Sequence, residues 1–304
     1  MKVINITKRQ LRKMLPLNLS RSIINKEGKL YIHDYKQKYG HFQDLLKIYN
    51  NQSESYIADK VAVITKLIAT FESLDMPELV TPTSLVSLDG EISGFAMPFI
   101  EDNTNLALLL NNPKVTLSQK IKLLKEILNI LIKVQDSHEL DGKFFLGDIH
   151  EANFIWDITE QTVRAVDMDS SYFSGGFISV SKVTTLNYLL EGFPNKYILD
   201  DESGKFIPNK DITSVSFIYM LLNVLSGCND SHHWSYNEFY NYLSFLEKKG
   251  LSKELLDIIA NLYTAGNIDI YNSELLDGID KNKDYTMTLA RIHKSNGGYY
   301  QNEK

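Results

Sequence analysis

The stretch over residues 144–172 constrains this chain most, because it places acidic and amide side chains at the ends of two short apolar segments. Asn153 follows Asp148 after five positions, and Asp167 ends an apolar run one predicted hairpin later. Carboxylate and amide oxygens suit Mg²⁺, and a carboxylate can orient a hydroxyl that attacks a phosphate. Any one of these residues alone would also fit a loop cap or an Asx turn. Their combined spacing predicts a site for a divalent metal and a phosphate.

Hydrophobic periodicity divides the chain into a strand-rich first third and a helical remainder. The segment 20–50 alternates like strands, a helix is predicted over 56–71, and Asp89-Gly90 predicts a type I′ hairpin turn. After Pro98 the apolar spacing becomes helical. Further helices are predicted from the Thr116 cap through 138, and over 211–226, 236–248 and 252–262.

This order of elements predicts an α+β fold with two lobes. Residues 1–19 are expected to form an N-terminal extension with a short basic helix, and 20–100 a small β-rich lobe. Residues 101–290 would form a larger helical lobe whose loops hold the acidic site. The last segment, 291–304, is expected to be a polar tail.

Composition excludes several classes of protein. The net charge of −6 argues against a nucleic-acid binder, which normally carries a basic face. The only cysteine, Cys228, rules out a disulfide within the chain. No apolar run has the length of a signal peptide or of a membrane span, and no heptad pattern is present. We therefore expect a cytoplasmic monomer without a membrane span.

The acidic stretch resembles the catalytic loop and metal-binding segment of the protein-kinase-like superfamily, in a divergent Ser/Thr form of bacterial or phage type. Kinases have His-Arg-Asp-x-x-x-x-Asn and then Asp-Phe-Gly, where this chain has Leu-Gly-Asp at 146–148, Asn153, and Asp-Met-Asp at 167–169. The resemblance implies a bilobal kinase-like fold that binds ATP with Mg²⁺, or alternatively Mn²⁺. Asp148 would orient the acceptor hydroxyl, and Asn153 and Asp167 would bind the metal.

The same resemblance assigns roles elsewhere in the chain. Lys47, in Leu-Leu-Lys-Ile-Tyr, matches the strand lysine that contacts nucleotide phosphates. His150 would touch the transferred phosphate or the substrate, with a structural histidine as the equal alternative. The segment 211–227 resembles a buried helix of protein kinases. The resemblance also places the kinase hinge here: Met97 would be the gatekeeper residue, and the backbone of Pro98, Phe99 and Ile100 would contact the adenine of ATP.

The chain departs from the kinase pattern at the nucleotide loop and on the helix after Lys47. Only Gly28 remains of the glycine-rich loop, and Glu27 would lie close to the anionic ligand. Asp59 is the candidate for the helix acid that pairs with Lys47, and it is one methylene shorter than the usual Glu. Asp169 either adds a second carboxylate to the metal site or caps a turn, and we favour the turn.

Three functions follow from these features. The first is transfer of the γ-phosphate of ATP to a Ser or Thr hydroxyl of an unidentified protein substrate. The second is a small-molecule kinase, because the segment Gly147-Asp148-Ile149-His150 is similar to a motif of aminoglycoside and choline phosphotransferases. The third is a pseudokinase, a binding or scaffold module without turnover, which the incomplete glycine loop favours.

Overall fold

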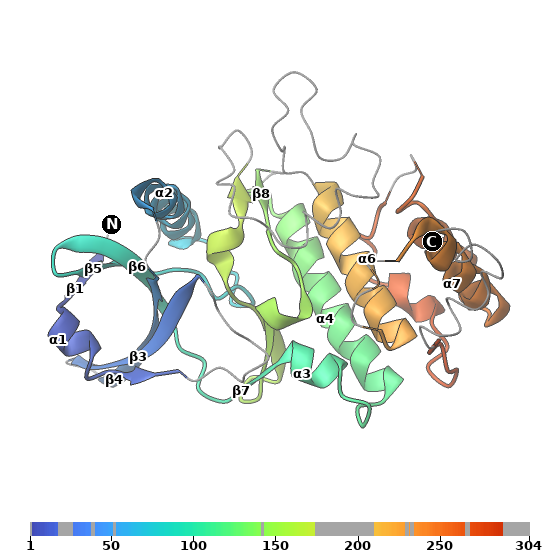
Figure 1. Cartoon of the computed structure of the whole chain (residues 1–304), viewed down its shortest axis with the longest axis horizontal. Coiled ribbons are helices and arrows are strands. Elements are labelled where there is room, and N and C mark those ends of the chain that lie inside the picture. Colours follow the sequence, from blue (N-terminus) through green and yellow to red (C-terminus); the bar gives the residue numbers. More distant parts are fainter. Residues whose placement is uncertain are drawn as a thin grey trace, which may run out of the picture. The chain divides into compact units, whose positions relative to one another are not determined.

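The chain divides into two compact units, and the division does not follow the order of the sequence. The computed structural model describes residues 2–17, 27–37, 40–50, 53–140, 143–173, 210–228, 231, 234–264 and 268–287. Among these, unit 1 combines the residues up to Asn103 with Ile155–Ser171, and unit 2 holds Thr104–Phe154 and the residues from Tyr172 onward. Strands dominate unit 1 and helices dominate unit 2, which confirms the α+β class (Figure 1).

A six-stranded mixed sheet forms the body of unit 1. Its order is β1-β5-β6-β4-β3-β2, and β1 and β5 run parallel while the other neighbours run antiparallel. The strands are β1 (Val3–Ile6), β2 (Leu15–Pro16), β3 (Gly28–Gln37), β4 (Gly40–Tyr49), β5 (Ser84–Leu88) and β6 (Glu91–Pro98).

The turn between β5 and β6 follows the sequence prediction. Asp89 and Gly90 both have positive φ, 52° and 96°. A type I′ turn needs positive φ at both central residues, and its twist matches that of the two strands. The turn therefore fixes β5 and β6 as a hairpin.

The N-terminal segment corrects the prediction of a separate extension over residues 1–19. Only Lys8–Leu11 is helical (α1), with Thr7 as its N-cap. Ile4 and Ile6 of β1 pack with Leu46, Ile48, Val86 and Ala96 on one face of the sheet. The alternation of apolar residues in Val-Ile-Asn-Ile is a strand signal, and burial of its apolar side makes the segment part of the sheet.

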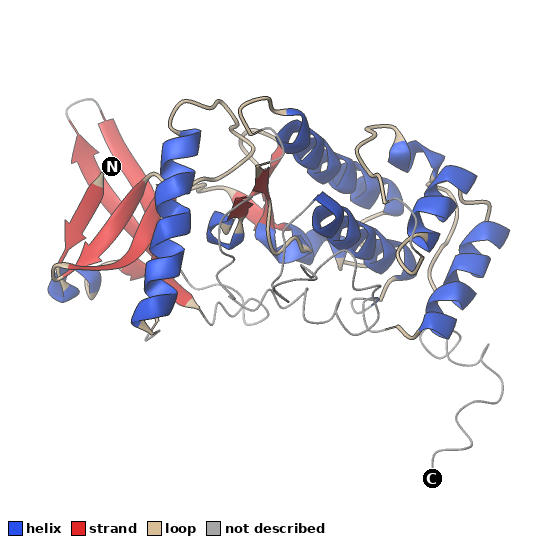
Figure 2. Cartoon of the chain, turned by 90° about the horizontal axis from the view of Figure 1, so that it is seen from above, coloured by secondary structure: helices blue, strands red, loops and turns tan. Residues whose placement is uncertain are grey.

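The opposite face of the sheet is covered by α2 (Glu54–Phe71), which begins after the Ser53 cap. Figure 2 shows this helix lying along the strands of unit 1. Ile64 of α2 belongs to one core cluster with Tyr49, Phe95 and Met97. Since side chains alternate along β4, Lys47 shares the α2 side of the sheet with Tyr49, while its neighbours face the other way.

A later segment of the chain also belongs to unit 1. β9 (Phe154–Asp157) and β10 (Thr162–Ala165) are adjacent strands, and the short 3₁₀ helix η2 (Met168–Ser170) follows them. The backbone at Ala165 donates to Glu78 and accepts from Val80. These bonds hold the segment that carries Asp167 and Asp169 against the chain that precedes β5.

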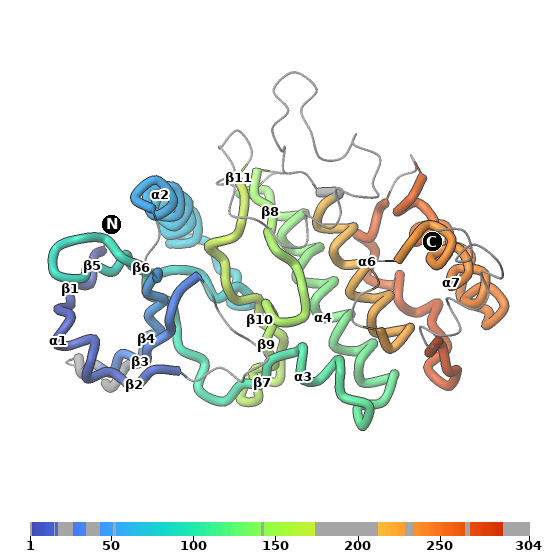
Figure 3. The backbone as a smooth tube through the Cα atoms, viewed as in Figure 1, coloured from blue at the N-terminus to red at the C-terminus, as the bar shows by residue number. Residues whose placement is uncertain are grey.

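The described part of unit 2 consists mainly of helices, and the chain enters this unit within β7 (Asn103–Asn105). Thr116 and Gln119 form a capping box at the start of α4 (Leu117–Asp136), whose Thr116 cap the sequence predicts. Within this helix, Ile121, Leu124 and Leu128 are buried. α4 and α6 lie side by side, and β8 pairs with β11 (Figure 3). The elements are α3 (Leu106–Leu110), α4 (Leu117–Asp136), β8 (Phe144–Phe145), η1 (Glu151–Asn153), β11 (Tyr172–Phe173), α6 (Lys210–Ser226), α7 (Tyr236–Lys248), α8 (Lys253–Ala260) and η5 (Leu275–Gly278).

The apolar α6 is explained by burial within unit 2, because nearly all of its described side chains are inaccessible to solvent. Within the described part of the chain, none of the helices combines the length and apolarity that a bilayer crossing requires.

Candidate functional site

The site in unit 1 is built around Lys47, whose side chain has no exposed surface. Its position on β4 directs it to the face covered by α2, where Phe95 and Leu30 are its neighbours across the strands. A buried ammonium is strongly destabilising unless opposite charges and hydrogen bonds compensate for lost hydration. Its partners therefore explain why this lysine can occupy the core.

Three carboxylates surround the ammonium of Lys47. Nζ lies 2.6 Å from Asp167 Oδ1, 2.7 Å from Glu27 Oε2 and 2.9 Å from Asp169 Oδ1. Asp169 also accepts a hydrogen bond from the Tyr49 hydroxyl at 2.9 Å. Residues far apart in the sequence thus converge on one charge.

A second lysine, Lys60 of α2, enters the same network. Its Nζ lies 2.8 Å from Glu27 Oε1, donates to the backbone carbonyl of Asp169 at 3.0 Å, and lies 3.5 Å from Asp169 Oδ2. The Tyr56 hydroxyl, one helical turn earlier, donates to Glu27 Oε1. Glu27 therefore bridges both lysines, one through each carboxylate oxygen.

The charges of the network move its pKa values in opposite directions. Burial alone would lower the pKa of Lys47, but Asp167 and Asp169 raise it well above its usual value. Burial opposes ionisation of Asp169 as well, yet Lys47 and Lys60 bring its pKa below the usual range. Burial raises the pKa of Asp167 to about 6; the Lys47 ammonium opposes that rise, and the neighbouring Asp169 adds to it. The two aspartates thus differ in how strongly their charge is stabilised.

Backbone conformation distinguishes the two aspartates further. Asp167 has a left-handed φ of 61°, which is uncommon outside glycine and which Asp adopts more readily than most residues. Asp169 lies in η2 and is fully buried. The favoured interpretation of Asp169 as a turn cap is corrected, because its carboxylate contacts Lys47, Lys60 and Tyr49.

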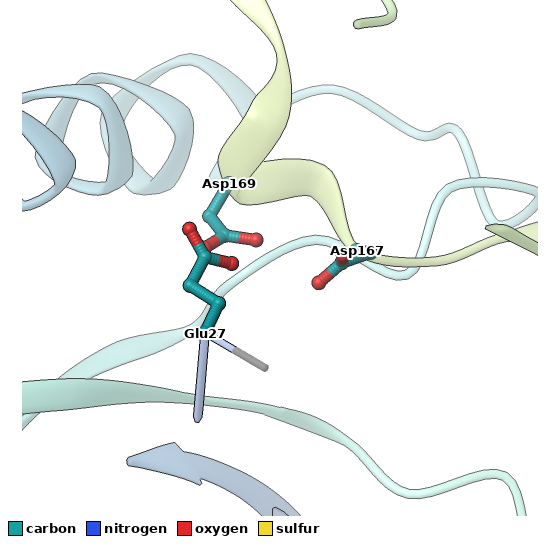
Figure 4. A group of neighbouring side chains, drawn as sticks. All are labelled: Glu27, Asp167 and Asp169. Atoms are coloured by element: carbon teal, nitrogen blue, oxygen red, sulfur yellow. The ribbon is translucent and has the colours of Figure 1, made fainter. Parts of the chain in front are cut away.

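Glu27, Asp167 and Asp169 could also supply ligands to a metal ion. One oxygen of each lies within 4.8 Å of the others, and Figure 4 shows the carboxylates gathered in one place. Oxygen-rich sites of this kind suit Mg²⁺ or Mn²⁺. The donor set fits such an ion, although in this structure Lys47 already contacts all three carboxylates.

One short segment of unit 2 holds three further predicted site residues, Asp148, His150 and Asn153. Asp148 has a left-handed φ of 48°, and Asn153 Nδ2 donates to its backbone carbonyl at 2.8 Å. His150 Nδ1 accepts from the Ala152 backbone at 3.2 Å, and its Nε2 lies 3.5 Å from Asp148 Oδ2. The ring nitrogen that faces Asp148 is therefore the one free to carry the proton of a neutral imidazole.

The predicted hinge lies at the end of β6. Met97 is buried in the core beside Tyr49 and Phe95, and Pro98 is exposed. Phe99 and Ile100 follow the strand, and the Ile100 carbonyl accepts a hydrogen bond from Asn103. Core packing accounts for Met97, and the proposed contact with adenine stays a prediction.

The structure gives Gly28 a packing role at the start of β3. A Cβ at this position would lie 2.7 Å from the Ile48 carbonyl oxygen of the neighbouring strand. Only glycine allows that approach without a shift of the backbone. Residues 25–26, which precede Glu27 at the position of the glycine-rich loop, lie outside the described residues, and so do residues 174–209.

The expected pairing of Lys47 with Asp59 is wrong. Asp59 is exposed on α2, and the next residue, Lys60, turns inward instead. One residue of helix rotates the side chain by about 100°, enough to separate the two positions. The sequence contained a signal for Lys60, because it is four residues before buried Ile64 on the apolar stripe of α2.

No protein-family model matches this chain, and no curated protein matches its sequence. The assignment of function therefore rests on the site itself.

Proposed function

We propose that the chain is an ATP-dependent phosphotransferase that transfers the γ-phosphate of ATP to a protein hydroxyl. The observation that supports this most is the contact between a fully buried strand lysine, Lys47, and Asp167 at the end of an apolar segment. Phosphoryl transfer needs positioned charge more than covalent help from the protein. The contact between Lys47 and Asp167 within unit 1 positions one positive and one negative charge for that purpose.

In this proposal the residues have separate roles. Lys47 binds phosphate oxygens, and Asp167 and Asp169 of the same unit hold Mg²⁺, which neutralises phosphate charge when it is bound. Asp148 accepts a hydrogen bond from the acceptor hydroxyl and orients it for attack. Asn153 fixes the loop through its bond to the Asp148 carbonyl.

The test is transfer from radiolabelled ATP in the presence of Mg²⁺, with the protein itself and generic proteins as acceptors. Asp167→Ala and Asp148→Ala are each expected to lower transfer by about a hundredfold or more, as loss of a positioned catalytic group does. Asp75→Ala removes an exposed carboxylate from unit 1 and serves as the matched control. Transfer that persists in Asp148→Ala would contradict the assignment.

One observation favours a second candidate, a binding module that retains nucleotide without turnover. Lys47 is engaged by three carboxylates, and α2 contributes Lys60 where an acid was expected. ATP binding without transfer, unchanged in Asp148→Ala, would support this candidate. Label that appears only on small hydroxyl compounds would instead favour a small-molecule kinase, the alternative that the Gly147–His150 motif suggests.

A further inference from the structure

We propose that Lys47, Lys60 and Tyr56 form an anion site for a phosphate group, and that Glu27 occupies this site until a ligand replaces it. The identity of the ligand, a metal-bound nucleotide, rests on the proposed function. The anion site itself rests only on contacts within unit 1. Glu27 would thus act as an internal competitor of the ligand.

The contacts of Glu27 are those of a bound anion. Lys47 approaches Oε2 at 2.7 Å, Lys60 approaches Oε1 at 2.8 Å, and the Tyr56 hydroxyl donates to Oε1. Two cations and a phenol thus converge on one carboxylate from a strand and a helix. A phosphate group presents several acceptor oxygens and fits the same convergent donors.

Burial excludes Asp169 as the carboxylate that leaves, and contacts distinguish the other two. The Asp169 side chain is fully buried, accepts from Tyr49, and its backbone carbonyl holds Lys60. Asp167, with 26% of its side chain exposed, contacts Lys47. Glu27 instead contacts Lys47, Lys60 and Tyr56 and so occupies the whole anion site. Glu27 keeps 21% of its side chain exposed and lies immediately before β3. A partly solvated side chain at the start of a strand can move away without opening the core.

Charge balance explains why Glu27 opposes a ligand. Two lysines and three carboxylates leave the network with one excess negative charge at neutral pH. Departure of Glu27 leaves Lys47 and Lys60 balanced by Asp167 and Asp169. An incoming phosphate then replaces one anion with another, so both lysines remain paired.

The experiment measures binding of inorganic tripolyphosphate and of ATP, each with and without Mg²⁺, by calorimetry on the full chain. Glu27→Gln keeps the shape of the side chain and removes its charge, and should tighten binding of both probes about tenfold or more. Lys60→Gln should weaken binding by a similar factor. Asp59→Asn and Lys66→Gln change the same charges at exposed positions of α2 and should leave binding within about twofold of the unmodified protein.

Other outcomes overturn the proposal. If Glu27→Gln weakens the Mg²⁺-dependent binding, Glu27 is a metal ligand and not a competitor. If Glu27→Gln and Lys60→Gln bind tripolyphosphate with the same affinity as the unmodified protein, the anion site does not exist, whether or not phosphate transfer occurs. Tighter tripolyphosphate binding by Glu27→Gln in a protein that transfers no phosphate would support the anion site while the proposed function fails. Should Lys60→Gln not fold, Glu27→Gln and its control still decide the question.

Discussion

Lys60 places a charged group on the buried face of α2. A lysine on an apolar stripe is costly to bury, and here the carboxylates of Glu27 and Asp169 compensate for its charge. The same two carboxylates also serve Lys47. Both lysines therefore depend on Asp169, the fully buried carboxylate of the network, because its removal leaves them with Glu27 and Asp167, which are partly exposed.

Asp169→Asn is the most direct test of that dependence. The change removes the buried carboxylate that both lysines contact, so we expect the free energy of unfolding to fall by about 3 kcal/mol. Chemical denaturation followed by circular dichroism measures the loss. Asp75→Asn changes the same group at an exposed site and should have little effect. Equal stability of both variants would show that the lysines do not depend on Asp169.

Asp157 provides a prediction for the dependence of stability on pH. Its carboxylate accepts from Arg164 Nε at 2.7 Å and from the Glu160 backbone at 3.1 Å. Burial would raise its pKa, but these bonds bring the pKa below the usual value. The contribution of the Asp157 carboxylate to the free energy of unfolding is therefore complete above about pH 4, which is the pKa of Asp in an unfolded chain. This contribution disappears as the pH falls through the lower pKa of Asp157 in the folded protein.

Asp157→Asn should accordingly lower the free energy of unfolding by about 2 kcal/mol at pH 7. The difference between the variant and the unmodified protein should shrink as pH falls below about 4, because both then lack the charge. Urea unfolding at pH 7 and at successively lower pH measures the difference. A gap that stays constant with pH would show that the carboxylate is not stabilised by its charge.

At the scale of elements, the approach of β6 to β4 determines where Lys47 lies. A Cβ at Gly94 would come within 1.9 Å of the Lys47 carbonyl oxygen. Gly94→Ala therefore forces the strands apart at the residue that carries the site. We expect a loss of about 2 kcal/mol or more in unfolding free energy, together with weaker binding of the nucleotide that we propose as the ligand.

Gly90→Ala provides a comparison for Gly94→Ala, because a Cβ at Gly90 meets nothing within 4 Å although its φ is positive. Strain at the turn should lower stability by about 1 kcal/mol without affecting the site. If nucleotide affinity falls equally in both variants, the effect of Gly94 is not local to Lys47.

Elements with strong local signals were predictable from the sequence. The capping box at Thr116 and the Asp89-Gly90 turn are read from adjacent residues, and both predictions are confirmed. The network was only partly predictable, because Lys60 and Asp169 are 109 positions apart and their contact depends on how the segments pack. The apolar period of α2 identifies its buried face but does not show which acid would meet a lysine there.

At the scale of the whole molecule, unit 1 is completed by a segment that the chain reaches only after starting unit 2. Asp167 and Asp169 both come from that segment. A fragment that ends at Asn103 lacks Asp167 and Asp169. Of the three carboxylates that contact Lys47 and Lys60 in the described network, it keeps Glu27 alone. Such an imbalance is incompatible with a stable core.

We therefore expect a fragment of residues 1–103 to lack cooperative unfolding. Joining residues 155–171 to it through a flexible linker should restore a transition, because the two aspartates and the backbone bonds at Ala165 return. Thermal unfolding followed by circular dichroism distinguishes the two fragments. A cooperative transition in the shorter one would show that the lysines tolerate the missing acids.

The burial of Lys47 has a consequence for chemical reactivity. Acylating reagents attack the neutral amine, and Lys47 combines a side chain of no exposed surface with a raised pKa. Lys60 is equally inaccessible, with 1% of its side chain exposed. Both should stay unmodified under conditions that label surface lysines such as Lys66, and peptide mass spectrometry would show this directly. The unlabelled pair then reports on the integrity of the site in any variant, without knowledge of its ligand.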